Sequence, residues 1–151
     1  NMKGYWNKPD ATKEAIQDEW FFSGDAGYFD EEGYLYIHDR VKDMIVSGGE
    51  NIYPAEVENA LMSNPEIIDA AVIGIPDEKW GESVKGFVVL KDGAELSEVD
   101  IISYVKSQIA GYKCPKSINF IDMLPRNPSG KVLRRELRAP FWEGVERNVG
   151  G

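Results

Sequence analysis

The sequence predicts an α+β fold in which a small mixed sheet is covered by helices and preceded by a β-hairpin. Helical patterns alternate with strand-like apolar runs after about residue 43, as in a domain whose helices pack on a sheet. Before that point, residues 34–37 read YLYI, an alternation typical of a strand, and residues 30–33 (DEEG) provide a hairpin turn. The 42% hydrophobic content of the 151 residues is enough for one or two small cores.

The expected elements follow one another along the chain. They are a short helix over residues 12–18, the hairpin, a short buried strand at 44–46, a helix at 54–63, strands at 67–75 and 84–90, a helix from 97 to about 110, a strand at 117–122 and a short helix at 132–137. Pro54 suits the first turn of its helix, and that helix is expected to end before Pro65. Ser97 is expected to cap the next helix, with Glu98 and Asp100 in its first turn.

A run of charged residues marks a boundary between two parts of the chain. The charges interrupt the apolar pattern between two strand-like segments, at Asp39, Arg40, Lys42 and Asp43. Such a break is typical of a linker or hinge. We therefore expect residues 1–41 to be the end of one domain, residues 42–140 to form a second, compact domain, and residues 141–151 to be a loose tail.

Composition argues against several classes of function. The net charge of −9 and the pI near 4.7 argue against a surface that binds nucleic acid. No apolar run approaches the ~20 residues that span a bilayer. The single cysteine, Cys114, excludes an internal disulfide, and the single histidine, His38, excludes a multi-histidine metal site. We expect a protein of a reducing compartment with no nucleic-acid partner, no transmembrane segment and no metal site of its own.

Residues 125–131, with the sequence PRNPSGK, form the most informative segment. Two prolines and a Ser-Gly pair predict a turn-rich loop with few hydrogen bonds, which holds Lys131 just ahead of a basic helical pattern. A lysine displayed in this way can act as a positive point charge toward a phosphate or carboxylate. The segment is not a P-loop, because Pro125 and Val132 occupy positions that would need glycine and Ser or Thr. The alternative is an ordinary surface turn.

Two upstream segments carry further candidates. Asp25 lies between Gly24 and Gly27, so the backbone can approach a ligand closely while the carboxylate accepts hydrogen bonds from hydroxyl groups. The alternative is that this carboxylate only caps a turn. Gly48 and Gly49 form a loop with no side chain to obstruct a narrow passage. The alternative for this second segment is a plain unit of strand, turn and helix.

Together these segments resemble the carboxy-terminal part of the adenylate-forming superfamily, and most closely the acyl-CoA synthetases (fatty-acid or aryl-acid CoA ligases). The similar segments are residues 4–12, 22–37, 39–58, 75–82 and 125–138, so the resemblance covers nearly the whole chain. Members of this family also have a large amino-terminal domain, which carries a phosphate loop and the acyl pocket. Since the chain starts in mid-motif without Met at position 1, we expect an excised carboxy-terminal fragment. The resemblance implies that residues 1–41 end the adenylation domain and that residues 42–140 form its lid.

The resemblance implies a reaction in two steps. A carboxylic acid, expected to be a fatty acid, attacks ATP to give an acyl-adenylate, and the thiol of CoA then displaces AMP to give a thioester. Lys131 would bridge the acyl carboxylate and the α-phosphate, where charge develops. Asp25 would hold the ribose hydroxyls, and Arg40 would contact the ribose or the phosphates. The lid would turn about Lys42 between the two steps.

The resemblance assigns other residues to the path of CoA. These are Ser47, Gly48 and Gly49 in the pantetheine channel, and Trp80, Tyr112 and Lys116 near the CoA nucleotide. The implied cofactors are ATP with Mg²⁺, bound mainly by the missing amino-terminal domain, and CoA as co-substrate. That domain would be a partner of this chain. A lysine acetyltransferase acting at Lys131 is a further expected partner, and acetylation should mimic the loss of this lysine because it removes the positive charge. The expected location is the cytoplasm, with peripheral attachment to a membrane through the missing part left open.

The positive charges of this acidic chain are concentrated near its carboxy terminus. They lie at Lys113, Lys116, Arg126, Lys131, Arg134, Arg135 and Arg138. A local basic patch suits the phosphates of a nucleotide or of CoA, although the last three arginines alternatively complement a helix end. The cluster of Lys113, Lys116 and Arg126 favours free CoA over a second reading, in which the parent loads the thiol of a carrier protein. A third reading is a stand-alone, non-catalytic binding module.

Overall fold

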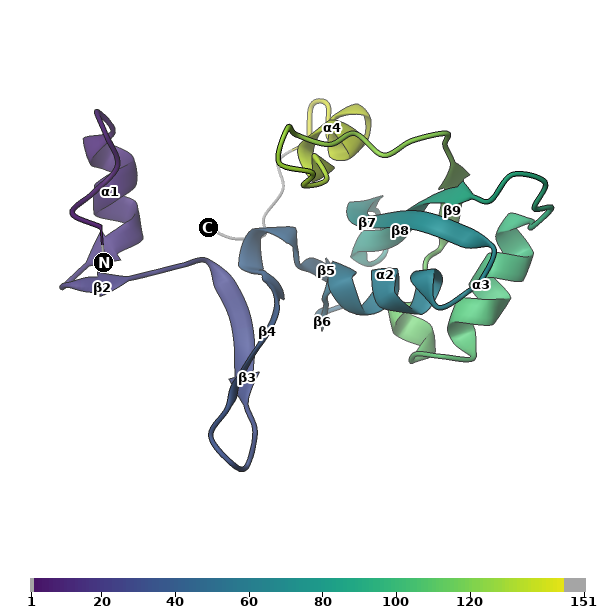
Figure 1. Cartoon of the computed structure of the whole chain (residues 1–151), viewed down its shortest axis with the longest axis horizontal. Helices are drawn as coiled ribbons and strands as arrows, with labels where there is room; N and C mark the ends of the chain where they lie inside the picture. The colour runs from purple at the N-terminus through teal and green to yellow at the C-terminus, as the bar shows by residue number, and fades with distance from the viewer. Residues whose placement is uncertain (1, 146–151) are drawn as a thin grey trace. The chain divides into compact units, whose positions relative to one another are not determined.

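The chain divides into two compact units, Asn1–Val41 and Lys42–Gly151 (Figure 1). The computed structural model describes residues 2–145. The first unit contains α1 (Pro9–Ala15), β1 (Ile16–Gln17), β2 (Trp20–Phe21), β3 (Asp25–Phe29) and β4 (Leu35–Arg40). Within residues 2–145, no helix is long and apolar enough to cross a membrane.

The first helix lies earlier than the sequence pattern suggested. It begins at Pro9, which occupies the first turn, and it ends at Ala15, so the predicted continuation to Asp18 is wrong. Asp18 and Glu19 both have positive φ, 48° and 67°, and they turn the chain between the paired strands β1 and β2. A helix cannot include residues in this conformation, because a right-handed helix requires negative φ.

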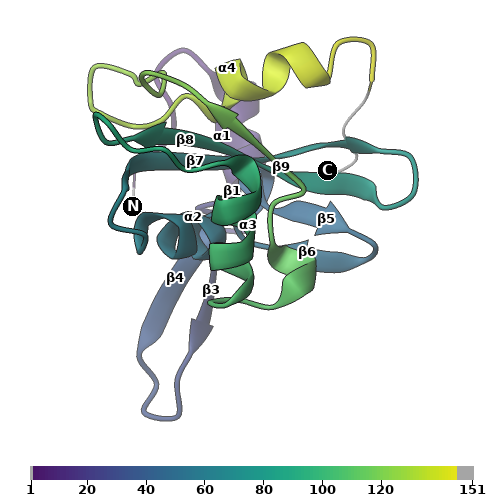
Figure 2. The same cartoon turned by 90° about the vertical axis from the view of Figure 1, so that its right-hand side faces the viewer.

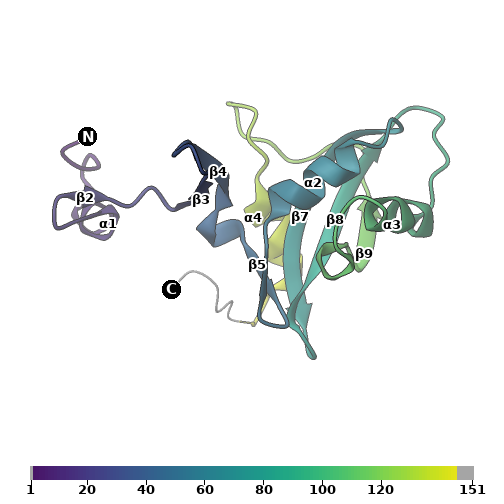
Figure 3. The same cartoon turned by 90° about the horizontal axis from the view of Figure 1, so that it is seen from below.

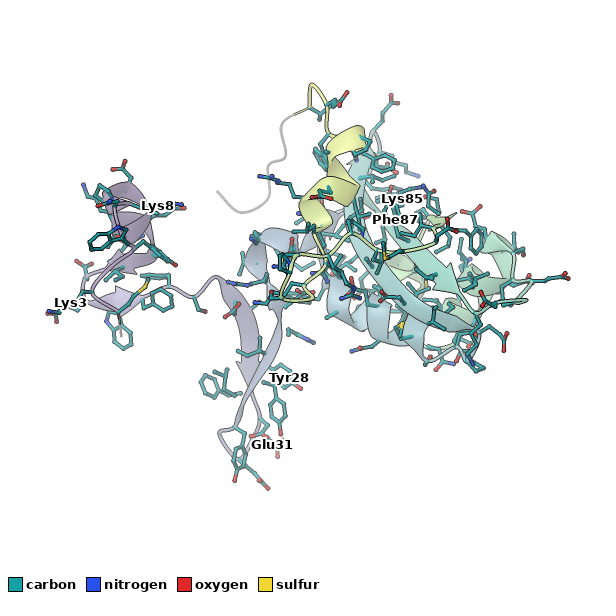
Figure 4. The ribbon with its side chains drawn as sticks, turned by 45° about the horizontal axis from the view of Figure 1, so that its top comes forward. Lys3, Lys8, Tyr28, Glu31, Lys85 and Phe87 are labelled. Atoms are coloured by element: carbon teal, nitrogen blue, oxygen red, sulfur yellow. The ribbon has the colours of Figure 1, made fainter. Side chains whose placement is uncertain are left out.

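The predicted hairpin is confirmed as the antiparallel pair β3 and β4. Asp30 fixes its turn, because Oδ1 accepts hydrogen bonds from the backbone N–H groups of Tyr34 at 2.8 Å and Glu32 at 3.0 Å. The Tyr34 hydrogen bond is the main reason that the pKa of Asp30 is lowered. Figure 4 shows Tyr28 on the hairpin and Glu31 at its turn. Many large apolar side chains of this hairpin are exposed in this chain, namely Tyr28, Phe29, Tyr34, Leu35, Tyr36 and Ile37.

The second unit is the predicted α+β domain. Its elements are η1 (Val41–Asp43, which starts in the first unit), β5 (Ile45–Ser47), β6 (Glu50–Ile52), α2 (Pro54–Met62), β7 (Ile67–Asp77), β8 (Gly81–Leu90), α3 (Glu98–Lys106), η2 (Gly111–Lys113), β9 (Ser117–Phe120), α4 (Arg134–Arg138) and η3 (Ala139–Phe141), where η denotes a 3-10 helix. The five-stranded sheet has the order β6-β5-β8-β7, and β9 also pairs with β8. Because β9 is parallel to β8 while the other pairs are antiparallel, the sheet is mixed, as predicted.

Helices cover both faces of this sheet, as Figure 2 shows with α2 and α3 on one side and α4 on the other. Alternation along β7 explains the two layers, because successive side chains of a strand point to opposite faces. Ala70 and Val72 join the core beneath α2 and α3, whereas Ala71 and Ile73 join the core beneath α4. Both faces are therefore apolar, and β8 is buried over almost its whole length.

Lys85 and Phe87 lie on the face of β8 that α4 covers (Figure 4). The ring of Phe141 packs edge-on against Phe87, with 6.4 Å between ring centroids, and lies 5.3 Å from the Lys85 ammonium. The indole N–H of Trp142 donates a hydrogen bond of 2.9 Å to the backbone oxygen of Gly74. The predicted loose tail is therefore wrong for residues 141–142, which pack on the sheet, and residues 146–151 of that tail lie outside the described residues.

The start of α3 was predicted correctly and its end was not. Ser97 caps α3 as predicted, and its hydroxyl and the Asp100 carboxylate bond reciprocally to backbone N–H groups. The hydrogen bond from the Ser97 hydroxyl is the main reason that the pKa of Asp100 is lowered. The predicted extension to Ala110 is wrong, because α3 ends at Lys106 and Ser107 forms the cap. The backbone N–H groups of Ser107 and Gln108 donate to the carbonyl oxygens of Tyr104 and Val105, three residues earlier. These hydrogen bonds tighten and close the last turn of the helix.

Candidate functional site

Lys131 lies on a compact loop between β9 and α4. The side-chain oxygen of Asn127 accepts three hydrogen bonds, from the backbone N–H and hydroxyl of Ser129 and from the backbone N–H of Lys131. The backbone N–H of Asn127 donates to the Lys131 carbonyl oxygen, and the Asn127 carbonyl oxygen accepts the N–H of Gly130, both at 2.9 Å. The expectation of a loop with few hydrogen bonds is therefore wrong, because an asparagine side chain supplies the acceptor that the backbone of a turn lacks. The Lys131 side chain is exposed.

Asp25 and Arg40 lie opposite each other at the open end of the β3–β4 hairpin. The Arg40 Nε atom is 3.1 Å from Asp25 Oδ1, and Arg40 Nη1 donates to the backbone oxygen of Ser23 at 2.7 Å. Gly24, with φ +74°, lets the chain turn into β3 at this point. The structure thus brings together the two residues that the resemblance assigns to the nucleotide. Both side chains are partly exposed, so the carboxylate can accept bonds from a diol.

Asp43, next to the predicted hinge residue Lys42, is buried in an ionic network. Only 7% of Asp43 is exposed, and its carboxylate lies 2.9 Å from Arg138 and 3.8 Å from Arg134. Arg134 also binds both oxygens of Glu58 at 2.8 Å. Breaking a buried ion pair is costly, about 3–5 kcal/mol, because it leaves an uncompensated charge. The Asp43 side chain is therefore held within the second unit by two arginines that follow it by about 90 residues or more.

The glycine loop and Trp80 form one cluster at the end of the sheet. Gly48 and Gly49 have φ of 61° and 87°, and these two positive values make the tight turn between β5 and β6. The backbone N–H of Gly48 donates to the Trp80 oxygen at 2.9 Å. The Trp80 ring lies over Gly48 so closely that a Cβ there would be 2.8 Å from ring atom Cε3. Ser47 pairs with Gly81 of β8, so two of the three residues assigned to the pantetheine channel, Ser47 and Gly48, meet Trp80 or its neighbour.

The strand β6 was missed in the sequence because it is short and polar. It consists of Glu50–Ile52, and only Ile52 is buried. The two glycines before it do signal a turn, but they fit a hairpin and a strand–turn–helix unit equally well. Its pairing with β5 depends on the positive φ values of both glycines, which the sequence permits and does not require.

Tyr112 and Lys116 lie apart from the glycine cluster along the chain, on η2 and just before β9. Both side chains are exposed, and Lys116 is tied to the sheet by a backbone bond of 2.8 Å to Val84. Between them, Cys114 is buried, and burial raises the pKa of its thiol. Lys113 binds both oxygens of Glu56 at 2.7 Å, so its ammonium is engaged within the lid. That hydrogen bond is the main reason that the pKa of Lys113 is raised.

The expected basic patch is wrong as a single surface. Ion pairs within the lid engage most of its members, since Arg126 binds Asp69, Lys113 binds Glu56, and Arg134 and Arg138 bind Asp43. Sequence showed the clustering of the cations but not their acidic partners, which come from α2, η1 and β7. The cluster of Lys113, Lys116 and Arg126 therefore gives no support for free CoA over a carrier-protein thiol. Lys116, Lys131 and Arg135 are exposed.

The Lys131 loop and the Gly48–Trp80 cluster lie at opposite ends of the sheet. Arg126 ties the loop to Asp69 near the start of β7, whereas Trp80 follows Asp77 at the end of that strand. The strand from Asp69 to Asp77 spans about 27 Å at about 3.4 Å per residue. Figure 3 shows the loop before α4 and the turn between β7 and β8 far apart. One rigid lid therefore cannot present both ends to the same point at once.

Within residues 2–145, no group of three or more His, Cys, Asp or Glu residues is arranged to hold a metal ion. The carboxylates of the lid that are closest to cations are already engaged with arginine or lysine, as at Asp43, Glu56 and Asp69.

Residues 56–131 match the family described as the AMP-binding enzyme C-terminal domain, and the chain belongs to this family. This confirms the resemblance to the carboxy-terminal domain of adenylate-forming acyl-CoA synthetases. Among curated relatives, a fatty acid–[acyl-carrier-protein] ligase, ScoC of Streptomyces coeruleorubidus, is 51% identical over 98% of this chain and 28% of its own length. The long-chain-fatty-acid–CoA ligase FadD13 of Mycobacterium tuberculosis (strain H37Rv) is 50% identical over 97% of this chain and 29% of its own length.

Solved structures give the same result. The o-succinylbenzoate CoA synthetase MenE of Bacillus subtilis, in complex with its acyl-adenylate intermediate OSB-AMP, is 41% identical, with a TM-score of 0.85 over 99% of this chain and 29% of that chain. ATP-bound MatB from Rhodopseudomonas palustris is 39% identical, with a TM-score of 0.85 over 95% of this chain and 29% of that chain. The chain thus spans less than a third of the length of these relatives.

Proposed function

We propose that this chain is the carboxy-terminal segment of an AMP-forming acid–thiol ligase, which activates a carboxylic acid as an acyl-adenylate and transfers it to CoA. The observation that carries the proposal is the placement of two candidate sites at opposite ends of one rigid lid. A reaction in two steps, each needing a different end of the lid, accounts for that placement. Family membership and the identity of about 50% with a CoA ligase support it.

In the first step, Lys131 would stabilise negative charge as the carboxylate approaches the α-phosphate of ATP. Its exposed ammonium on a tightly bonded loop suits this role, because a fixed charge needs little reorganisation when the reaction occurs. Asp25 would accept hydrogen bonds from the ribose hydroxyls, and Arg40 would orient that carboxylate while contacting the nucleotide. Mg²⁺, which would neutralise the phosphates, would be held mainly by the amino-terminal domain.

In the second step, the lid would turn and present the Gly48–Trp80 end. The backbone of the two glycines leaves room for a thin pantetheine arm, and the partly exposed indole of Trp80 offers an apolar wall beside it. The pivot would be Lys42, since Asp43 is held by Arg138 and Arg134 and moves with the lid. Tyr112 and Lys116, both exposed, would meet the CoA nucleotide.

The exposed apolar faces of the β3–β4 hairpin support a role for residues 1–41 as the end of a larger sheet. Phe29 is 70% exposed and Ile37 is 61% exposed, which is costly for a hairpin alone in water. Packing against an amino-terminal adenylation domain would bury them. By this proposal the purified chain alone has no activity, and ATP–pyrophosphate exchange by it would contradict the assignment of the phosphate loop and acyl pocket to another domain.

A carrier-protein thiol is the second candidate acceptor. One relative with 51% identity acts on an acyl-carrier protein and another with 50% identity acts on CoA, so the lid sequence is compatible with either. We favour a fatty acid as substrate because both of these relatives are named for fatty acids. A cytoplasmic location, a peripheral attachment to the membrane that supplies such acids, and acetylation of the exposed Lys131 by a lysine acetyltransferase complete the proposal.

The test uses the longer enzyme that contains this segment. Fatty acids of different length should each be assayed for acid-dependent ATP–pyrophosphate exchange without any thiol. CoA and a phosphopantetheinylated carrier protein should then be added separately, and release of AMP and thioester measured. Thioester formation with CoA supports the main proposal, and formation with only the carrier protein supports the second. Absence of acid-dependent exchange would contradict both.

A further inference from the structure

Asn127 forms hydrogen bonds with both the backbone N–H and the backbone oxygen of Lys131. Its Oδ1 accepts the Lys131 N–H at 2.8 Å, and its own N–H donates to the Lys131 oxygen at 2.9 Å. Its backbone oxygen accepts the N–H of Gly130 at 2.9 Å, and Gly130 has φ +83°, which closes the turn. A single residue thus holds the backbone of Lys131 through two hydrogen bonds, while Lys131 itself is exposed.

Arg126 fastens the same loop to the sheet. Its Nη1 donates to the backbone oxygen of Gly130 at 2.6 Å, and its Nη2 lies 2.9 and 2.7 Å from the two carboxylate oxygens of Asp69 on β7. Asp69 is itself oriented, because its Oδ1 accepts the N–H of Ala70 at 3.1 Å. The planar guanidinium makes several bonds in a fixed geometry, which lysine could not reproduce.

These contacts lie outside the apolar core of the domain. Arg126 is exposed, and neither it nor Asn127 belongs to the apolar clusters on the two faces of the sheet. An exposed ion pair such as Arg126–Asp69 contributes only about 0–1 kcal/mol to stability. This density of bonds surrounds one exposed lysine. It suits a group that must reach the same point each time a domain closes.

We propose that Asn127 and Arg126 are positioning residues for Lys131, and that they hold its backbone so that the ammonium reaches the carboxylate and the α-phosphate in one geometry. The proposal deepens the proposed function and rests on it. It also gives Arg126 a role different from attraction of CoA phosphates. Ordering the loop in advance removes part of the entropy cost that would otherwise oppose the first step.

The experiment measures the two half-reactions separately in the longer enzyme. Asn127→Ala should slow acid-dependent ATP–pyrophosphate exchange about 10- to 100-fold in kcat, the range for a displaced catalytic group. The KM for ATP and the thioester step from preformed acyl-adenylate should stay near those of the parent. Asn127→Asp keeps an acceptor oxygen for the loop and should restore most of the rate. Ser129→Ala, which removes only a hydroxyl donor to Asn127, is the matched control and should be near the parent.

A double substitution distinguishes positioning from a general structural role. If Asn127 acts through Lys131, adding Asn127→Ala to Lys131→Ala should cause no further loss of exchange. Independent, multiplying losses would overturn the proposal, and so would a fall in both half-reactions together with the midpoint of urea unfolding. The proposed function fails separately: if Lys131→Ala alone leaves exchange unchanged, Lys131 is not the charge-stabilising group at all. Arg126→Lys should show the same selective loss as Asn127→Ala, and an unchanged rate would exclude Arg126 from the role.

Discussion

Replacing Gly48 with alanine is expected to slow the thioester-forming step and to leave adenylation intact. At φ +61°, an added Cβ costs about 1–2 kcal/mol in backbone strain. That atom would also lie 2.8 Å from Cε3 of Trp80, so the indole would have to move, an overpacking that typically costs a further ~1–3 kcal/mol. Because we propose that Trp80 lines the path of the thiol, its displacement obstructs the second step only.

Gly49→Ala is the matched control for this prediction. Gly49 has φ +87°, but an added Cβ meets no atom within 4 Å. Both substitutions therefore carry the backbone strain of about 1–2 kcal/mol, and only Gly48→Ala displaces the Trp80 ring. Both substitutions also add a methyl group to the loop that we propose lines the pantetheine channel, so the difference between the two variants reports the displacement of the indole.

The assay follows both half-reactions in the longer enzyme. Each variant receives preformed acyl-adenylate and CoA, and thioester release is timed by rapid quench, while ATP–pyrophosphate exchange reports the first step. We expect Gly48→Ala to lose about tenfold or more in thioester formation, and to lose more than Gly49→Ala, which adds a methyl group to the channel without moving the indole. Equal thioester rates in the two variants would refute the role of the Trp80 position. Loss of exchange in Gly48→Ala would instead show that the whole lid is damaged.

Three further predictions concern single residues. Lys131→Ala should lose on the order of 10²–10³ in adenylation, the range for one preorganised donor, yet form thioester from preformed acyl-adenylate at nearly the parent rate; a similar loss in both steps would argue for a general binding role. Lys42→Pro fixes φ near −65° and should slow thioester formation far more than adenylation, whereas Lys42→Ala should be mild; equal losses from Lys42→Pro would remove the hinge from this residue. Burial raises the pKa of the Cys114 thiol, so in the folded chain it should react with iodoacetamide much more slowly than in urea at pH 8. Since that pKa is raised on folding, the contribution of this thiol to stability should be constant below the ordinary thiol pKa and fall as the pH rises above it, and Cys114→Ala should remove that contribution.

Most of the fold could be predicted from local patterns. The capping box at Ser97 and the strong apolar runs of β7 and β8 carry their signal in a few neighbouring residues. The wrongly predicted boundaries lie where the local sequence fits more than one element, or where pairing with another strand determines the backbone conformation. Asp18 and Glu19 have helix-compatible sequence but take positive φ, because Gln17 pairs with Trp20 across the turn.

The sequence could predict which residues belong to the candidate site, but not how they are arranged in space. The motifs around Lys131, Asp25 and Gly48 were found in the sequence, because each needs an unusual local composition of glycine and proline. The sequence did not reveal that Asn127 binds Lys131 through its side chain, although an Asn-Pro-Ser-Gly run is a recognised turn signal. Nor did it pair Trp80 with Gly48, since those residues are distant along the chain.

The sequence by itself determined the α+β class, the family and the identity of the residues that carry charge near a candidate nucleotide site, because these depend on local composition. Only the tertiary structure decided which cations are engaged in ion pairs within the domain. Arg126, Arg134 and Lys113 look alike in sequence, yet Asp69, Glu58 and Glu56 from distant elements bind them, while Lys131 stays exposed. The separation of Lys131 from Trp80 along the sheet is likewise a consequence of strand length and pairing, which act between segments far apart in the chain.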